Sequence, residues 1–182
     1  SSLDIINRKN KSILSVGRLE EQKNYQFIIE ALSNSEFELS IIGTGSMKEG
    51  LINLAHTVKT NLKIINNISN SKLMEVYKDY KYFILSSNFE GNPKVLLEAM
   101  SAGCIPIVSN IQNNSEIIDD GYNGFLFDLD NKGKDVLKKI LHDDLDFRMI
   151  TNNATNTIKL RFSLEKIASQ EVSNLQKLTS RS

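Results

Sequence analysis

A regular alternation of short apolar runs with segments of helical spacing restricts the fold of this sequence more than any other feature. The apolar runs are rich in Ile and Val and show little polar alternation, as is typical of strands that are covered on both faces. We expect strands at residues 12–16, 37–42, 62–65, 82–85, 104–108 and 124–127, and helices at residues 25–32, 47–57, 71–78, 94–102, 112–118 and 134–141.

This order of strand, helix and strand predicts an α/β fold. We expect a Rossmann-like domain with a six-stranded parallel sheet, helices on both faces and further helices at the carboxyl terminus. The 182 residues contain no repeat or linker, so one domain is expected over residues 1–182. Its sheet is expected over about residues 12–145, followed by a helical tail over 146–178 in which Ser163 caps the last helix.

Composition and charge exclude several classes of protein. Twenty-two basic residues balance 22 acidic residues, which argues against a nucleic acid partner. No apolar run approaches the ~20 residues of a membrane span, and the chain does not open with a secretory signal. The single cysteine, Cys104, excludes an internal disulfide and a thiolate metal cluster. We therefore expect a cytoplasmic protein.

The loop after the first strand contains two cations. Ligand sites of open parallel sheets lie beyond the carboxyl ends of the strands, and Arg18 and Lys23 are both expected at that edge. An Arg grips phosphate through two parallel N–H bonds while a Lys adds a compact charge, so the pair suits a diphosphate. Spacing alone leaves open the alternative that Glu20 and Glu21 neutralise both cations at the surface.

The loop after the second strand, Gly43-Thr44-Gly45, resembles the start of a dinucleotide-binding fingerprint. Lys48 stands where the third glycine would be, and the next strand ends in Asn66-Asn67 without the acidic residue that would hold a ribose. We interpret the loop as a tight turn that lets the backbone approach a ligand, or as a turn only.

The loop after the fourth strand, with the helix that follows it, carries the strongest signal. Asn92 and Pro93 are expected as the N-cap and first residue of a helix that is apolar on nearly all sides. A lone carboxylate in such a helix, Glu98, is costly unless it faces a polar cleft, and Glu90 precedes it in the loop. The alternative is that Glu98 pairs with Lys94 one turn earlier.

These motifs together resemble the retaining glycosyltransferases of the GT-B fold, in glycosyltransferase family four (group 1). Glu90 and Glu98, with seven residues between them, look like the paired glutamates of that family. The resemblance covers roughly residues 12–178 and follows the family order through Ser15-Val16-Gly17-Arg18-Leu19, Lys23, Ile41-Ile42-Gly43-Thr44-Gly45, Leu85-Ser86-Ser87, Leu96-Leu97-Glu98-Ala99-Met100, Pro106-Ile107-Val108-Ser109, Glu116-Ile117-Ile118, Gly121, Gly124 and Phe162-Ser163.

The resemblance implies a carboxy-terminal domain that binds the nucleotide-sugar donor. It implies that Arg18, Lys23 and Glu90 carry the catalytic functions: the first two hold the donor diphosphate, and the third contacts hydroxyls of the transferred sugar. It further implies that Glu98 binds the ribose and that Asn67 and Ile68 lie at the base. The remaining donor-binding positions implied are Gly17, Gly43, Gly91, Asn92, Lys94 and Val95.

The resemblance also implies a reaction. The parent protein is expected to be a hexosyl- or hexosaminyltransferase of polysaccharide, lipid or glycan biosynthesis that retains the linkage stereochemistry. It is expected to need no metal or other cofactor and to use a UDP- or GDP-linked sugar. A glycan or lipid-linked acceptor is expected to bind an amino-terminal domain absent from this chain, so the chain alone should be inactive. Pro93-Lys94 replaces the glycine and aliphatic residue of many relatives, which leaves the sugar open.

Other functions stay open at this stage. A non-catalytic nucleotide-sugar-binding module would share the same pocket. A nicotinamide-dependent oxidoreductase would need the complete glycine fingerprint, and a flavodoxin-like signalling domain would need acidic residues where Arg18 and Lys23 stand. A metal-dependent transferase is suggested by Asp128-Leu129-Asp130 and Asp144-Leu145-Asp146, which we interpret as solvated surface.

Overall fold

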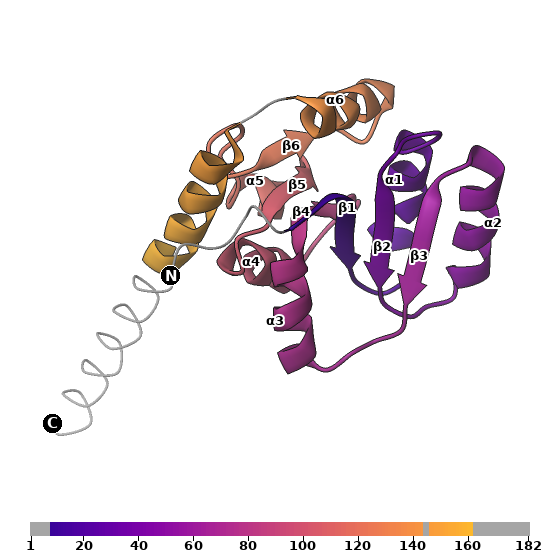
Figure 1. Ribbon diagram of the computed structural model, residues 1–182, viewed down its shortest axis with the longest axis horizontal. Coiled ribbons are helices and arrows are strands. Elements are labelled where there is room, and N and C mark those ends of the chain that lie inside the picture. Colours follow the sequence, from indigo (N-terminus) through magenta and orange to yellow (C-terminus); the bar gives the residue numbers. More distant parts are fainter. Residues whose placement is uncertain (1–7, 144–145, 162–182) are drawn as a thin grey trace, which may run out of the picture.

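The computed structural model describes residues 8–143 and 146–161 and shows one parallel sheet (Figure 1). Its strand order is β3-β2-β1-β4-β5-β6, so all six predicted strands and the Rossmann-like α/β class are confirmed. The strands are β1 (Lys9–Val16), β2 (Glu38–Ile42), β3 (Asn61–Ile65), β4 (Tyr80–Leu85), β5 (Ile105–Ser109) and β6 (Phe125–Phe127).

The six helices predicted between residues 25 and 141 are also present, and a short 3-10 helix that the sequence did not predict, η2 (Glu21–Lys23), follows β1. A further helix covers residues 147–161, whereas the expected last helix and its Ser163 cap lie outside the described residues. No helix in the described part of the chain is long and apolar enough to cross a membrane. The labelled helices are α1 (Tyr25–Ala31), α2 (Lys48–Val58), α3 (Asn70–Asp79), α4 (Lys94–Ser101), α5 (Gln112–Ser115) and α6 (Asn131–His142).

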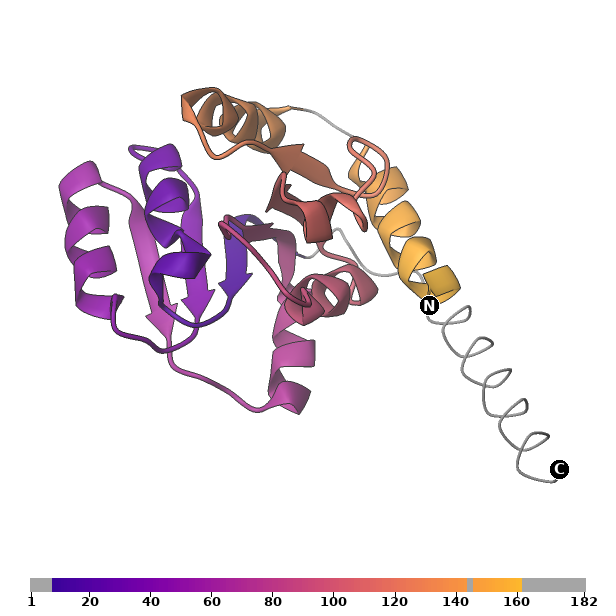
Figure 2. The same ribbon diagram turned by 180° about the vertical axis from the view of Figure 1, so that it is seen from behind.

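Helices cover both faces of the sheet, as the apolar strand pattern predicts. Successive strand residues point to opposite faces, so Ile13 of β1 packs in one core cluster and Leu14 in the other. The first cluster joins the sheet to α1, α2 and α6, and the second joins it to α3 and α4. Figure 2 gives the view from behind. The helix over 147–161 contributes to both clusters, through Ile150 to the first and Ile158 to the second.

The strand order decides which loops meet at the carboxyl edge of the sheet. β1 pairs with β4 in parallel, with Leu14 opposite Phe83, so the loops that follow these two strands start side by side. From β1 the chain adds β2 and β3 on one side, and then β4, β5 and β6 on the other. Such a change of direction between two neighbouring strands leaves a crevice beyond their carboxyl ends. The cations after β1 and the carboxylates after β4 therefore belong to one edge.

Cys104, which precedes β5, is buried and makes a simple probe of the fold. Its thiol donates to the carbonyl oxygen of Tyr77 at 3.1 Å, and burial raises the pKa of the thiol to about 12. Because the thiolate is the reactive form, we expect no reaction of the folded chain with a disulfide reagent at about pH 8. Thiol titration checks this, with the guanidinium-unfolded chain as the control. Rapid labelling of the folded chain would contradict the burial.

Candidate functional site

Hydrogen bonds connect the loop after β1 to the loop after β4. The hydroxyl of Ser86 donates to the carbonyl oxygen of Lys23 at 3.0 Å, and the backbone N–H of Asn88 donates to the carbonyl oxygen of Gln22 at 2.9 Å. The amide of Gln22 in turn donates to the carbonyl oxygen of Phe89 at 2.8 Å. These bonds hold η2 against the β4–α4 loop and bring Lys23 to Glu90.

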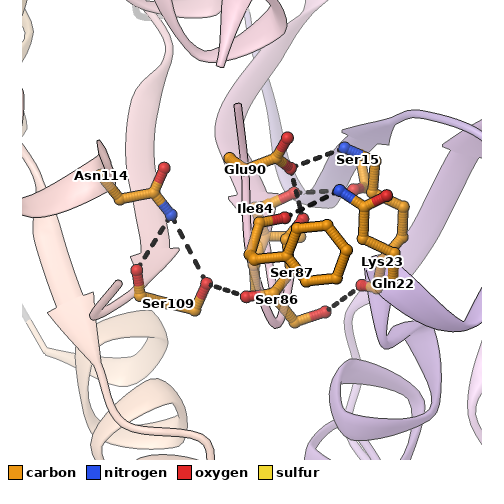
Figure 3. Close-up of polar contacts among 10 residues, drawn as sticks. Ser15, Gln22, Lys23, Ile84, Ser86, Ser87, Glu90, Ser109 and Asn114 are labelled. Carbon is orange, nitrogen blue, oxygen red and sulfur yellow. Dashed lines mark hydrogen bonds and ion pairs between the residues drawn. The ribbon is translucent and has the colours of Figure 1, made fainter. Parts of the chain in front are cut away.

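Lys23 and Glu90 form a nearly buried ion pair. Lys23 Nζ lies 2.6 Å from Glu90 Oε1, and the two side chains are 14% and 7% exposed. The hydroxyl of Ser87 donates to the same Oε1 at 2.5 Å. Figure 3 shows both contacts reaching the same carboxylate oxygen of Glu90. The partner of Lys23 is thus Glu90, and the alternative that Glu20 or Glu21 neutralises it is wrong.

Arg18 remains at the surface, and Glu20 is engaged elsewhere. The carboxylate of Glu20 accepts hydrogen bonds from Ser46, from its backbone N–H at 3.0 Å and from its hydroxyl at 2.8 Å. These bonds lower the pKa of Glu20, with a smaller contribution from the charge of Arg18. Arg18 is exposed and makes no ion pair within residues 8–143 and 146–161. Its guanidinium is therefore available to an anion.

Two clefts of about 380 and 320 Å³ meet at this edge and share five residues, so we treat them as one feature, the rim groove. Arg18 lines both parts, Glu98 the larger part, and Lys23 and Glu90 the smaller part. The four charged residues predicted from sequence thus converge on one groove. Its lining consists of Val16, Gly17, Arg18, Gln22, Lys23, Ile42, Asn67, Ile68, Asn70, Leu73, Glu90, Gly91, Asn92, Lys94, Val95 and Glu98.

Glu98 has two protein partners and still lines the groove. The hydroxyl of Tyr77 donates to Glu98 Oε2 at 3.3 Å, and burial together with the charge of Glu98 raises the pKa of Tyr77. Tyr77 therefore stays protonated and remains a donor. Lys94 Nζ lies 3.4 Å from Oε1, so the alternative pairing considered from sequence is present. That pair is weak, because the Lys94 side chain is 69% exposed and water screens it.

Helix α4 begins at Lys94, as the expected range 94–102 has it, but its N-cap lies one residue later than expected and the helix is less buried. Pro93 is its N-cap and Lys94 its first residue, because the Lys94 N–H already donates to the carbonyl oxygen of Asn92 at 2.8 Å in a tighter turn. Val95 and Leu97 are half-buried where an all-apolar helix predicted burial. Val95 lines the rim groove, and Leu97 lines a neighbouring cavity of about 520 Å³, so open space surrounds two sides of the helix.

One predicted donor-binding residue, Gly43, does not line the groove. A Cβ atom at Gly43 would lie 1.9 Å from the carbonyl oxygen of Gly17, so the glycine serves the close packing of two loops. Conversely, sequence reasoning missed Gln22 and Ser87 as site residues. Gln22 lies between the two cations in sequence and belongs to no motif that indicates a binding site. Ser87 belongs to the family motif, which gives it no role in the site.

The two Asp-x-Asp pairs take other roles where the structure describes them. The carboxylate of Asp130 accepts from the N–H of Gly133 at 2.7 Å and caps α6. That of Asp146 accepts from the N–H of Met149 at 3.2 Å near the start of the helix over 147–161. Asp144 lies outside the described residues. Within the described ranges, no group of three or more His, Cys, Asp or Glu residues is placed to hold a metal ion.

Comparisons of sequence identify relatives of this chain. The sequence model of the family described as glycosyl transferases group 1 matches residues 4–157. A curated relative from Campylobacter jejuni, named N-acetylgalactosamine-N,N'-diacetylbacillosaminyl-diphospho-undecaprenol 4-alpha-N-acetylgalactosaminyltransferase, is 29% identical over 172 residues. That match covers 92% of this chain and 47% of the relative, so the chain spans less than half of the relative's length.

Solved structures share the fold. The carboxy-terminal domain of the group 1 family glycosyl transferase LpcC from Francisella tularensis matches with a TM-score of 0.73 and 21% identity, over 88% of this chain and 90% of that one. The pneumococcal O-GlcNAc transferase GtfA, solved in complex with UDP and GlcNAc, matches with a TM-score of 0.77 and 19% identity, over 93% of this chain and 37% of that one. The expected similarity to a carboxy-terminal domain of this fold is confirmed.

Proposed function

This chain belongs to the glycosyl transferases group 1 family, and from that premise we propose that it binds the nucleotide-diphosphate sugar of a retaining, metal-independent glycosyltransferase. The observation that carries the proposal is the convergence of Arg18, Lys23, Glu90 and Glu98 on the rim groove. In a sugar nucleotide, the diphosphate would pair with the two cations, and hydroxyl groups of the ribose and the sugar would donate hydrogen bonds to the two carboxylates.

The proposed ligand runs along the groove in a defined order. Asn67 and Ile68 line the end next to α3, where the base would lie. The ribose hydroxyls would donate to the carboxylate of Glu98, whose side chain is 21% exposed. The diphosphate would then lie between Arg18 and Lys23, and the sugar would reach Glu90. This order follows the positions that the family resemblance implies.

The chemistry that this arrangement favours is departure of a diphosphate. Glycosyl transfer breaks the bond between the anomeric carbon and the diphosphate, so negative charge grows on the leaving phosphate. Arg18 and Lys23 would stabilise that charge in advance, a role in which a single donor contributes about 3 to 4 kcal/mol. In this proposal the two cations, with the backbone N–H groups before α4, take the place that a metal ion has in other transferases.

The acceptor and the whole reaction belong to a longer protein in this proposal. The Campylobacter jejuni relative is more than twice as long as the matched region, and its name describes a lipid-linked acceptor. We propose that the parent protein transfers a hexosyl or hexosaminyl group to a glycan or lipid-linked acceptor held by a second domain. The 182-residue chain alone is then expected to bind donor without turning it over.

A panel of donors tests the proposal directly. Saturation-transfer and calorimetric titrations of this chain would compare uridine, guanosine and adenosine diphosphate sugars. We expect binding of one base class, with saturation transferred to protons of the base, the ribose and the sugar. Failure of all three classes to bind would contradict the proposal, and transfer of sugar by the isolated chain would contradict the need for a second domain.

A further inference from the structure

The carboxylate of Glu90 uses only one of its oxygens within the protein. Lys23 Nζ at 2.6 Å and Ser87 Oγ at 2.5 Å both reach Oε1, and among the described residues no hydrogen bond reaches Oε2. The side chain is only 7% exposed, but Oε2 is not among the buried polar atoms that lack a partner, so this oxygen remains accessible in the groove that Glu90 lines. An acceptor of this kind is satisfied best by a ligand that brings its own donor.

Glu90 is also held firmly in place. Ser87, which donates to it, is fully buried and receives the hydroxyl of Ser109 on its carbonyl oxygen at 2.7 Å. The carbonyl oxygen of Ser109 accepts from the side-chain amide of Asn114 at 2.9 Å. Figure 3 shows this chain of contacts running from Asn114 through Ser109 to Ser87, in the loop after β4. Glu90 is therefore not free to turn away when a ligand arrives.

A diphosphate that binds Lys23 must approach this fixed carboxylate. A phosphate oxygen within hydrogen-bond distance of Lys23 Nζ shares that donor with Glu90 Oε1, which already lies 2.6 Å from it. Two like charges around one ammonium repel each other, and the effect is larger in a partly buried groove than in water. A bare nucleoside diphosphate meets the repulsion without compensation, whereas a sugar nucleotide offers hydroxyl donors to Oε2.

We propose that Glu90 makes the groove prefer a nucleoside diphosphate that carries a sugar over the same nucleoside diphosphate without one. This inference rests on the proposed function and goes beyond a contact between Glu90 and the sugar, because it assigns the residue a penalty against the bare nucleotide. The penalty also has a consequence for turnover. Once the sugar has been transferred, the product is the disfavoured ligand, so Glu90 promotes its release.

The experiment compares two ligands on two proteins by calorimetry. The ligands are UDP and UDP-N-acetylglucosamine, or the guanosine pair where the donor panel selects guanosine, and the variant is Glu90→Gln. Gln keeps the size of the side chain and removes its charge. We expect the variant to bind UDP about tenfold more tightly than the unaltered chain, and the preference for the sugar nucleotide to fall at least as much. UDP affinity that is unchanged or lower in the variant would overturn the inference.

Two further variants keep the result interpretable. Glu75→Gln makes the same change of charge on α3, where Glu75 is 72% exposed, and should change neither affinity. Ser87→Ala leaves the charge of Glu90 in place and removes one of its two hydrogen-bond donors, so a smaller rise in UDP affinity is expected. If thermal unfolding shows that Glu90→Gln lowers the folded fraction, the UDP affinity of Ser87→Ala tests the inference instead. If the unaltered chain binds no nucleotide, the proposed function is overturned. If it binds nucleotide normally, and the preference is unchanged in both Glu90→Gln and Ser87→Ala, this inference alone is overturned.

Discussion

Replacing Lys23 by Ala is expected to abolish measurable binding of a nucleoside diphosphate. The substitution removes a cation from the groove and also leaves Glu90, which is 7% exposed, without its counter-charge. Truncating one partner of a charge pair between protein and ligand costs about 2 to 5 kcal/mol, so loss of the contact between Lys23 and a phosphate should lower the affinity roughly 30-fold or more. Calorimetric titration measures this loss. Thermal unfolding should show a lower stability as well, because the remaining carboxylate is buried and unpaired.

Arg18→Ala is the matched variant, because its effect should be confined to binding. Arg18 is exposed and makes no ion pair in the described part of the chain, so the free energy of unfolding should stay within about 0.5 kcal/mol of its original value. The affinity for a nucleoside diphosphate should nevertheless be lost. Arg18→Lys should restore only part of it, since Lys keeps the charge but loses the paired N–H donors.

A double variant separates the two effects of Lys23. Lys23→Ala combined with Glu90→Gln removes the unpaired carboxylate, so this protein should be more stable than Lys23→Ala alone and should recover some nucleotide affinity. Lys72→Ala, on the first turns of α3, provides a control in which an exposed Lys outside the groove is lost. Unchanged affinity in both Arg18→Ala and Lys23→Ala would count decisively against the site.

The fold was predictable because its strands are buried on both faces. A strand such as β5 (Ile105–Ser109) is buried at every residue, so its sequence is an apolar run that no surface helix would show. Once the strands are identified, their regular alternation with helices along the sequence is enough to predict a Rossmann-like domain. The start of α4 was less predictable, because the choice between Asn92 and Pro93 as N-cap depends on a local turn that both residues permit.

The site was predictable only in part. Arg18, Lys23, Glu90 and Glu98 were identified through the family motif, whereas spacing alone did not distinguish surface neutralisation from a ligand site. The Lys23–Glu90 pair joins residues that are 67 positions apart, and it forms because β1 and β4 are neighbours in the sheet. No local pattern contains that information. The hydrogen bond from Ser87 to Glu90 spans only three residues, but it depends on the conformation of the loop between them, which the sequence pattern does not specify.

The glycines after β2 show how a motif can point to the wrong partner. The pattern Gly43-Thr44-Gly45 suggested a backbone that approaches a ligand. In the structure the approach is to the loop after β1: the N–H of Leu19 donates to the carbonyl oxygen of Thr44 at 2.9 Å. A Cβ atom at Gly45 would lie 2.4 Å from the carbonyl oxygen of Leu19. The two glycines thus permit contact between two stretches of backbone, one of which carries Arg18.

Gly43→Ala is therefore expected to damage both stability and binding. The added methyl would lie 1.9 Å from the Gly17 carbonyl oxygen and 2.9 Å from its carbon, so backbone must move. Overpacking of this kind costs about 3 kcal/mol, which lowers the Tm by roughly 6 to 12 °C for a chain of this size. Displacing Gly17 also displaces Arg18, so nucleotide affinity should fall in the fraction that remains folded.

Gly50→Ala is the control that isolates the steric cause of this loss. Gly50 lies in α2, and a Cβ atom there would meet no atom within 4 Å. Because Ala favours helix over Gly by up to about 1 kcal/mol, this variant should unfold at a slightly higher temperature and bind nucleotide normally. Opposite shifts in Tm from one chemical change would show that the clash between the loops, and not the loss of glycine itself, lowers the stability, and a loss of nucleotide affinity in Gly43→Ala alone would tie the same contact to Arg18. Equal Tm values for the two variants would refute that explanation.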